Sequence, residues 1–390
     1  MRVIVVGAGP GGLTLANGLR QAGIEVVVYE RNQQHGRSQG VSLHLEDQAT
    51  TALRACLAPE QLDMMSAAVG ARRDRVLSLT EQDGALVVSG SQSFENAPHL
   101  SANRRPVDRQ LLRAVLLSGV SDVVRFGTAL TGFEQRSDST VRARFADGST
   151  DTADLLVGAD GIGSVVRRQY LPHVRVLDTG RCTLLGATPL SSLAGTGLPE
   201  LIGDNPAKVQ VTGTTMIVAA VRFTAPPPAL RERWQAALRH GGVSEVEDYL
   251  MWALPTSAQH RGTDDSSEAV RRHARELTAA THPALRQVVE QARPATLARL
   301  SIGSLTATSP WTASNVTLLG DAAHAAPGFG ANSAMWDAQR LNELLIEVAG
   351  GKQGLLAAIG TYEEAMRGAD ARPASFPGAR PQGRPTGTSA

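Results

Sequence analysis

The sequence contains only two cysteines among its 390 residues, Cys56 and Cys182. Two thiols cannot build a disulfide framework or a thiolate metal site, and no group of His, Cys and Asp residues has the spacing of metal ligands. We therefore expect no bound metal. So few cysteines fit a reducing cytoplasm, in which both side chains are ordinary buried residues.

Long apolar runs and an excess of one charge are also missing. No stretch approaches the roughly 20 apolar residues that a membrane-spanning helix needs. The first apolar run ends after residue 6 in a glycine-rich loop, which predicts a strand rather than a signal peptide. The sequence has 38 Lys and Arg residues against 37 Asp and Glu residues, a formal net charge of +1, which excludes the broad basic surface of a nucleic-acid-binding protein.

What is present is an ordinary globular composition, with 42% hydrophobic and 19% charged residues. This composition excludes disorder for most of the chain. The length exceeds the size at which one hydrophobic core stops growing, so it predicts two domains or one bilobal unit. Residues 371–390 are rich in Pro, Gly and Arg, and we predict that this tail is disordered.

A glycine-rich loop near the start of the chain joins a predicted buried strand, residues 2–6, to a predicted helix, residues 13–22. The loop reads Gly7-Ala8-Gly9-Pro10-Gly11-Gly12. In a dinucleotide-binding loop the first glycine permits a tight turn, the second admits the phosphates and the third lets helix and strand pack closely. Because strand, loop and helix occur together, the pattern predicts nucleotide binding.

Glu30 follows the second predicted strand, residues 25–29, at the distance from Gly12 where a carboxylate accepts hydrogen bonds from both ribose hydroxyls. A carboxylate at this position repels a 2′-phosphate, which excludes NADP as the tightly bound ligand. The first motif alone leaves NAD and FAD open.

Two further buried strands end in loops that carry an aspartate. Residues 154–157 precede Asp160-Gly161-x-x-Ser164-x-x-Arg167, and residues 315–319 precede Gly320-Asp321-Ala322-Ala323-His324. Asp321 is placed to accept a hydrogen bond from a ribityl hydroxyl. The backbone N–H groups of residues 330–332 open a predicted helix, and such donors stabilise negative charge on a reduced flavin.

The other segments predict a mixed architecture. We expect helices at 47–57, 108–117, 230–240, 268–279 and 333–349, a hairpin within 128–148, and strands within 72–101, 208–223 and 249–254. In the last strand, Met251 and Trp252 favour core packing over a substrate wall. The basic group Arg72-Arg73-x-Arg75 favours a solvated surface, and a weaker alternative is that it attracts NADPH phosphates.

The three motifs, in this order and spacing, resemble the class A flavoprotein aromatic hydroxylases, the p-hydroxybenzoate hydroxylase-like superfamily. Residues 37–44 and 104–117 resemble the branch near the tetracycline-inactivating monooxygenases. The resemblance implies an α/β fold, with a Rossmann-like FAD-binding domain of glutathione reductase type and an inserted mixed-sheet substrate domain. We assign 1–75, 102–180 and 298–368 to the FAD-binding domain, and 76–101 and 181–297 to the substrate domain.

The resemblance also implies a role for each cofactor-binding residue. Gly7, Gly9, Pro10 and Gly12 would hold the FAD pyrophosphate, Glu30 the adenosine ribose, and Arg31 would lie near the adenine. Arg109 would contact FAD, Asp160 would serve FAD and transient NADPH, and Asp321 would bind the ribityl chain. Gly330, Ala331 and Asn332 would present amides to the pyrimidine edge of the flavin, and Gln39 would approach the ring from the other side.

The implied activity is that of a monooxygenase. FAD stays bound, NADPH or NADH docks briefly, and O₂ forms a flavin C4a-hydroperoxide that hydroxylates an aromatic or polyketide-like small molecule. No second strand–glycine–helix unit exists for a nicotinamide nucleotide, which fits brief docking. We expect a monomer or homodimer.

One departure from the family pattern lies between His324 and Asn332, where the loop is about three residues shorter than usual. The candidates for the catalytic pocket are His44, Pro327 and Phe329, although a structural role is favoured for His44. The short loop keeps two alternatives open: a flavin-dependent oxidase, and a redox-impaired flavin- or ligand-binding protein that shields a pathway intermediate.

Overall fold

The computed structural model describes residues 1–34, 41–94, 105–226, 228–243, 245–257, 265–306, 310–325 and 330–369. Gln39, Pro327, Phe329 and the predicted disordered tail lie outside these ranges. Within them, no helix has the length and apolarity that a membrane span requires. The same residues contain no group of three or more His, Cys, Asp or Glu side chains that is arranged to hold a metal ion.

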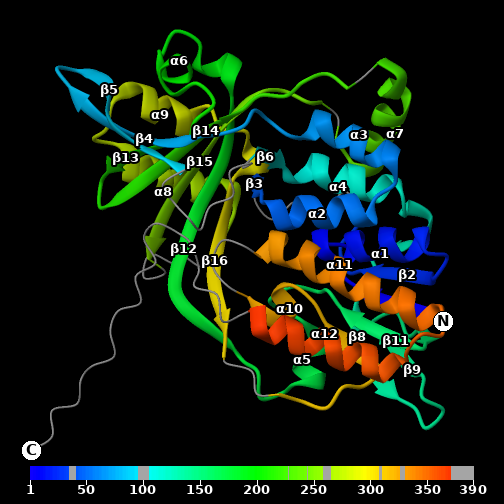
Figure 1. Cartoon of the computed structure of the whole chain (residues 1–390). Helices are drawn as coiled ribbons and strands as arrows, with labels where there is room; N and C mark the ends of the chain where they lie inside the picture. Colours follow the sequence, from blue (N-terminus) through cyan, green and yellow to red (C-terminus); the bar gives the residue numbers. More distant parts are fainter. Residues whose placement is uncertain are drawn as a thin grey trace, which may run out of the picture.

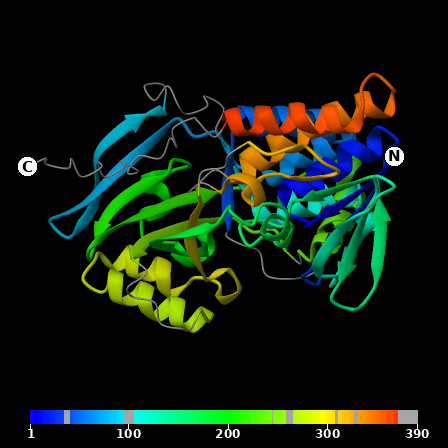
Figure 2. The same cartoon turned by 90° about the horizontal axis from the view of Figure 1, so that it is seen from below.

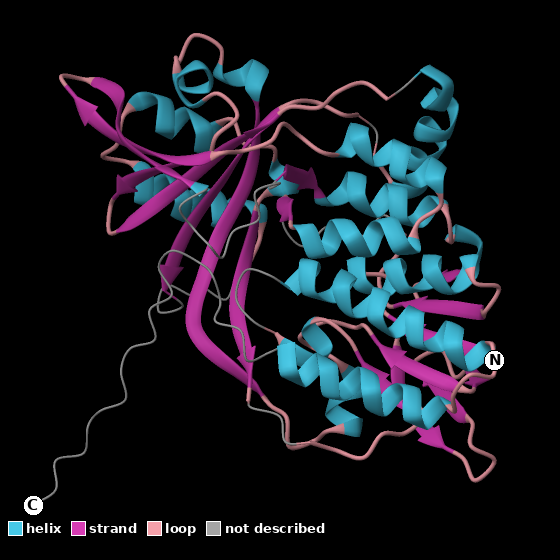
Figure 3. Cartoon of the chain, in the orientation of Figure 1, coloured by secondary structure: helices cyan, strands magenta, loops and turns pink. Residues whose placement is uncertain are grey.

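Two large sheets lie side by side and divide the molecule into two lobes (Figure 1, Figure 3). The five-stranded parallel sheet has the order β17-β11-β1-β2-β7. Its strands are β1 (Arg2–Val6), β2 (Glu25–Glu30), β7 (Val124–Phe126), β11 (Leu155–Gly158) and β17 (Val316–Leu318). We call this half the parallel-sheet lobe.

The seven-stranded mixed sheet forms the core of the other half, the mixed-sheet lobe. Its order is β16-β12-β15-β14-β13-β4-β5. Its strands are β4 (Arg75–Gln82), β5 (Ala85–Ser93), β12 (Val176–Pro189), β13 (Ala207–Val211), β14 (Thr214–Val221), β15 (Tyr249–Ser257) and β16 (Ala298–Leu305).

Two smaller sheets and the helices complete the fold. The small sheets contain β8 (Leu130–Gln135), β9 (Val141–Phe145) and β10 (Thr150–Ala153), and the pair β3 (Ser42–Leu45) and β6 (Arg105–Asp108). The helices are α1 (Pro10–Gln21), α2 (Asp47–Cys56), α3 (Pro59–Ala68), α4 (Arg109–Ser118), α5 (Val165–Tyr170), α6 (Leu198–Ile202), α7 (Arg231–Gly241), α8 (Ser267–Thr278), α9 (Pro283–Glu290), α10 (Asp321–His324), α11 (Gly330–Ala349) and α12 (Leu355–Ala369).

The parallel sheet forms where the sequence has short runs of β-branched residues. Val3, Ile4 and Val5 of β1 have no exposed surface, because strands flank β1 on both sides and other elements cover both faces of the sheet. On β2, the ring of Tyr29 packs on Phe145 of the three-stranded sheet, with centroids 4.1 Å apart. The two sheets therefore share one core with α1 and α11.

The predicted elements are confirmed at most positions, with shifted ends. Helix α1 begins at Pro10 instead of residue 13, because proline at the first helical position costs no hydrogen bond. Helix α11 begins at Gly330 instead of residue 333. Sequence analysis missed α3, α9, α12 and the ribbon of β3 and β6.

Strand β12, which sequence analysis also missed, starts at Val176 and continues past a register shift between Asp178 and Arg181. Gly180 in this bulge has a φ of +67°, a conformation that glycine adopts at little cost. Residues 298–305, assigned above to the FAD-binding segments, form β16 and pair with β12 in the mixed sheet. The division of the chain into domains stays a prediction.

The mixed sheet has two unlike faces. Trp252 of β15 has no exposed surface and shares a core with Leu250 and Leu254 and with residues of α8 and α9, the helices that cover this face in Figure 2. Side chains alternate along a strand, so Met251 points to the opposite face, beside Ala187 and Ala219 on the neighbouring strands. The core prediction is confirmed for Trp252, whereas Met251 lies on the face away from α8 and α9.

Arg73 corrects the prediction of a solvated basic surface at residues 72–75. Arg72 and Arg75 are exposed, but Arg73 is only 1% exposed. Its guanidinium donates hydrogen bonds to the carbonyl oxygens of Asp204 and Ala220. The charge is therefore buried at the base of the mixed sheet and is not available at the surface to attract a phosphate.

The unlike faces generate a prediction for two adjacent residues. Trp252→Ala should destabilise the protein by about 3–5 kcal/mol, because it leaves a cavity in a filled core. Met251→Ala should cost less than half as much, because its side chain is only partly buried. Urea denaturation of both variants measures the two losses of unfolding free energy, and equal losses would contradict the assignment of the faces.

Candidate active site

The carboxyl ends of four parallel strands lie at one edge of the sheet. Strand β1 leads into the glycine-rich loop, β2 ends at Glu30, β11 leads to Asp160 and β17 leads to Asp321. In open parallel sheets, ligands bind in the crevice outside this edge. The fold thus brings together motifs from both ends of the chain.

The glycine-rich loop is shaped by close approaches of the backbone. Gly7 has a φ of +108°, and a β-carbon there would lie 2.4 Å from the carbonyl oxygen of Ala159. A β-carbon on Gly12 would lie 2.1 Å from the carbonyl oxygen of Gly7. At Gly9, in contrast, nothing lies within 4 Å of the β-carbon position, so the loop is open there.

The amino end of α1 meets this open space. Its N-cap residue, Gly9, has no side chain that accepts from the helix, Pro10 follows, and the first turn contains no acidic residue. The first N–H groups of an α-helix have no partners within the helix, and the helix dipole favours an anion there. The loop and the helix end together suit a phosphate group.

Glu30 lies beside the same loop, and its carboxylate accepts hydrogen bonds from backbone N–H groups. One carboxylate oxygen accepts from the N–H of Ala8 at 2.9 Å and the other from the N–H of Asn32 at 2.8 Å. Arg31 beside it is exposed. Arg113 of α4, which sequence analysis missed, is near enough that the Glu30 charge partly offsets the lowering of the Arg113 pKa by burial.

Asp160 and Asp321 each keep one buried carboxylate oxygen that has no hydrogen-bond partner among the described residues. Oδ2 of Asp160 accepts from the N–H of Val165 at 2.7 Å, whereas its Oδ1 has no hydrogen bond. Oδ1 of Asp321 is likewise buried and unpaired. Because an unsatisfied buried acceptor costs about 1–3 kcal/mol, these two atoms suit a ligand that donates hydroxyl groups.

The surroundings of Asp321 are crowded and charged. Burial raises the pKa of its carboxyl, while the charges of His324 and Arg109 act in the opposite direction. A β-carbon on Gly330 would lie 2.0 Å from Oδ1 of Asp321. Only glycine therefore allows the start of α11 to approach this carboxylate so closely.

Asn332 fixes the first turn of α11 against β3. Its side-chain oxygen accepts from the N–H of Glu46 at 3.0 Å, and its side-chain nitrogen donates to the carbonyl oxygen of His44 at 2.8 Å. Since α11 begins at Gly330, the N–H groups of residues 330–332 have no acceptor inside the helix. They are available to a ligand beside Asp321.

The two histidines of the motifs make side-chain contacts with other residues. Nε2 of His44 lies 2.6 Å from the guanidinium of Arg73, which favours the structural role over that of a general base. Nε2 of His324 lies 2.5 Å from Oδ2 of Asp337, and the same oxygen accepts from the N–H of Gly320 at 2.9 Å. Asp337 thus anchors both ends of α10.

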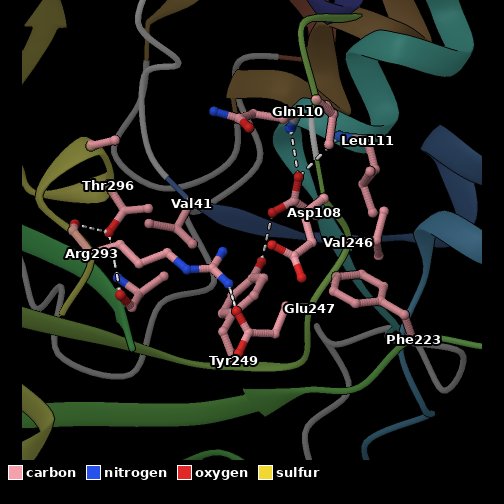
Figure 4. Close-up of a pocket in the computed structure, with 14 residues that line it drawn as sticks. Val41, Asp108, Gln110, Leu111, Phe223, Val246, Glu247, Tyr249, Arg293 and Thr296 are labelled. Atoms are coloured by element: carbon pink, nitrogen blue, oxygen red, sulfur yellow. Dashed lines mark hydrogen bonds and ion pairs between the residues drawn. The ribbon is translucent and has the colours of Figure 1, made fainter. Parts of the chain in front are cut away.

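A second hollow lies between the lobes, beside the start of α4 (Figure 4). It encloses about 580 Å³, including space open to solvent, and Val41 and Phe223 form part of its apolar wall. Asp108 caps α4 by accepting from the N–H groups of Gln110 and Leu111, and it also accepts from the hydroxyl of Tyr249 at 2.9 Å. An aspartate directly before a helical pattern is an N-cap signal, so Asp108 could have been found from the sequence. Tyr249 could not.

The chain is similar in sequence to several known proteins. Residues 1–369 match the family described as an FAD binding domain. A dual O-methyltransferase/FAD-dependent monooxygenase of Phaeosphaeria nodorum is 31% identical over an alignment of 383 positions, which covers 89% of this chain and 40% of that protein. An FAD-dependent urate hydroxylase of Mycolicibacterium vanbaalenii is 27% identical over 346 residues, 87% of this chain and 78% of that protein.

A solved structure covers nearly the whole fold. It is a Photorhabdus luminescens protein named as a candidate FAD containing monooxygenase, with a TM-score of 0.76 and 29% identity over 95% of this chain and 94% of that one. The chain spans about two fifths of the dual-function relative that it matches. The fold, the motif loops and the match over residues 1–369 show that the chain belongs to the FAD binding domain family, the class A flavoprotein monooxygenases that resemble p-hydroxybenzoate hydroxylase.

Proposed function

We propose that the chain is an FAD-dependent monooxygenase that hydroxylates an aromatic or polyketide-like small molecule. The observation that carries the proposal is the pair of buried, unpaired oxygens on Asp160 and Asp321, at the same sheet edge as the uncapped start of α1. FAD has a pyrophosphate for the helix end and hydroxyl groups for the carboxylates. Relatives named as a dual O-methyltransferase/FAD-dependent monooxygenase and as an FAD-dependent urate hydroxylase support the same conclusion.

In this proposal the parallel-sheet lobe holds FAD. Gly7, Gly9, Pro10 and Gly12 bind the pyrophosphate, Glu30 the adenosine ribose and Arg31 the adenine. Arg109 and Asp160 would contact the cofactor, and Asp321 would bind the ribityl chain. The amides of Gly330, Ala331 and Asn332 face the pyrimidine edge.

A bound FAD would supply the redox chemistry, with NADPH or NADH as the source of electrons and O₂ as the source of the hydroxyl oxygen. The chain contributes positioning and electrostatics. The amides at the start of α11 stabilise negative charge on the reduced ring, and the two lobes keep water away from the reacting atoms.

The face of the mixed sheet opposite Trp252 is the proposed substrate wall. Ala187, Ala219 and Met251 lie in register on three neighbouring strands of this face. Ala187 and Met251 pack with Val41, Val221, Phe223 and Tyr249. Ala187 also lines the hollow beside Asp108, and an apolar lining suits a flat, apolar substrate.

Asp321→Ala tests the assignment of the cofactor site. The variant loses hydrogen bonds from a charged acceptor, about 1.5–3 kcal/mol, so FAD should bind roughly ten- to a hundredfold more weakly. Flavin absorbance of the purified proteins measures this, with Glu347→Ala on the exposed side of α11 as a control. A flavin content equal to that of the wild type would count heavily against the proposal.

The reaction itself is tested with the FAD-loaded wild type. NADPH without oxygen should bleach the flavin slowly, and faster when an aromatic substrate is present. With ¹⁸O₂, a monooxygenase places one labelled atom in the product. An unlabelled product formed together with peroxide indicates an oxidase, and a flavin that never bleaches favours the shielding role.

The protein without FAD should show the cost of the buried Asp321 carboxylate. The folded protein raises the pKa of this group above its value in the unfolded chain, so ionisation weakens folding as the pH rises through and above the usual aspartate range. Asp321→Asn should therefore melt at a higher temperature than wild type at pH 7. The gain should shrink toward pH 4, and a gain that is independent of pH would contradict this account.

A further inference from the structure

The ribbon of β3 and β6 lies between the two lobes (Figure 1). The strands pair antiparallel, with Ser42 opposite Asp108 and His44 opposite Pro106. Beyond the ribbon, the chain continues from β3 into α2 and from β6 into α4. Both strands thus belong to segments of the parallel-sheet lobe, and β6 contacts β14 of the mixed sheet.

Tyr249 attaches one end of the ribbon to the mixed sheet. This residue of β15 is 4% exposed, and its hydroxyl donates to Oδ2 of Asp108 at 2.9 Å, as Figure 4 shows. Burial raises the pKa of Tyr249 well above its ordinary value, so the hydroxyl keeps its proton. The other oxygen of Asp108 is held by the first N–H groups of α4.

Arg73 attaches the other end. Its Nη2 donates to the carbonyl oxygen of Ala220 on β14 at 2.6 Å, and its Nε donates to the carbonyl oxygen of Asp204 at 3.1 Å. Its Nη1 lies 2.6 Å from Nε2 of His44 on β3. Because a guanidinium only donates hydrogen bonds, Nε2 of His44 is the acceptor and the ring proton lies on Nδ1.

The ribbon is also hydrogen-bonded to α11. The carbonyl oxygen of His44 accepts a hydrogen bond from the side-chain nitrogen of Asn332, and the N–H of Glu46 donates to the side-chain oxygen of Asn332. His44 is therefore held from the mixed sheet through its ring and holds the first turn of α11 through its backbone. Between Ala220 and Asn332, each step is a hydrogen bond no longer than 2.8 Å.

We propose that Arg73 and Tyr249 are positioning residues for the flavin: they fix the ribbon to the substrate wall, and the ribbon fixes the amide donors of residues 330–332. The inference rests on the proposed function, because it takes these amides to face the flavin. Ala220, the acceptor for Arg73, directly follows Ala219 of the substrate wall. The wall and the flavin donors thus keep one relative position.

Burying an arginine between two lobes costs desolvation free energy, and apolar side chains of similar volume often stabilise such a contact as well or better. The guanidinium provides direction instead, because its planar fork sets the angles of three contacts at once. A lysine at position 73 has one ammonium and cannot serve three acceptors in this geometry. Directional contacts of this kind would keep the distance between the substrate wall and the flavin ring fixed.

Arg73→Gln and Tyr249→Phe test the proposal, with matched controls of the same residue types. Arg72→Gln alters the exposed neighbour of Arg73. Tyr170→Phe removes a hydroxyl that donates to the carbonyl oxygen of Thr312, on an element outside the ribbon. The measurements are the Kd of FAD, the midpoint potential of the bound flavin, and the melting temperature and circular dichroism of each protein.

Both ribbon variants should lower the flavin midpoint potential, because displacing the amides removes more stabilisation from the reduced, negatively charged ring than from the oxidised ring. Arg73→Gln should also raise the Kd of FAD at least tenfold, and Arg73→Lys should not restore it. Both controls should match the wild type in Kd and potential. A role in stability alone would lower the melting temperature without moving the potential.

Folded ribbon variants with the Kd and potential of the wild type would overturn the inference and leave the proposed function intact. If Arg73→Gln does not fold, Tyr249→Phe decides, since it removes one hydroxyl and leaves Asp108 its two backbone donors. A wild type that takes up no FAD would overturn the proposed function and this inference together.

Discussion

The contact between Gly12 and the carbonyl oxygen of Gly7 is the constraint on which the rest of the site depends. It brings α1 so close to the end of β1 that a β-carbon has no space. The uncapped helix end therefore sits at the same edge as Glu30, Asp160 and Asp321, which follow the neighbouring strands. A wider approach would move the phosphate site away from the carboxylates that complete it.

The site lowers the stability of the folded chain when no ligand is bound. Buried oxygens of Asp160 and Asp321 have no hydrogen-bond donor in the part of the chain that the structure describes, and burial disfavours the charge of Asp321. Such groups lower the stability of a protein that binds nothing. A ligand that binds only the folded state returns this stability in proportion to its concentration, so binding and folding are linked through the same few atoms.

The sequence was most informative where chemistry and local structure coincide. The glycine loop, Glu30 and the strand before Asp321 could be placed because backbone approach and strand pattern are local properties. Arg73 was placed wrongly because its acceptors, on Asp204 and Ala220, come from segments far along the chain, and no local pattern separates a buried arginine from a solvated one. The attachment of Tyr249 to Asp108 was missed for the same reason. Gln39, Pro327 and Phe329 lie outside the described residues, and their roles stay predictions.

The order of the strands in the parallel sheet has a consequence for synthesis of the chain. Strand β17 occupies one edge of that sheet, beside β11, although it follows all the other described strands in the sequence. Chains emerge from the ribosome amino end first, so the phosphate loop exists long before the loop of Asp321. The mixed-sheet lobe is translated in between. Assembly of the complete site is therefore a late event, one that has to wait until the segment of Asp321 has been synthesised.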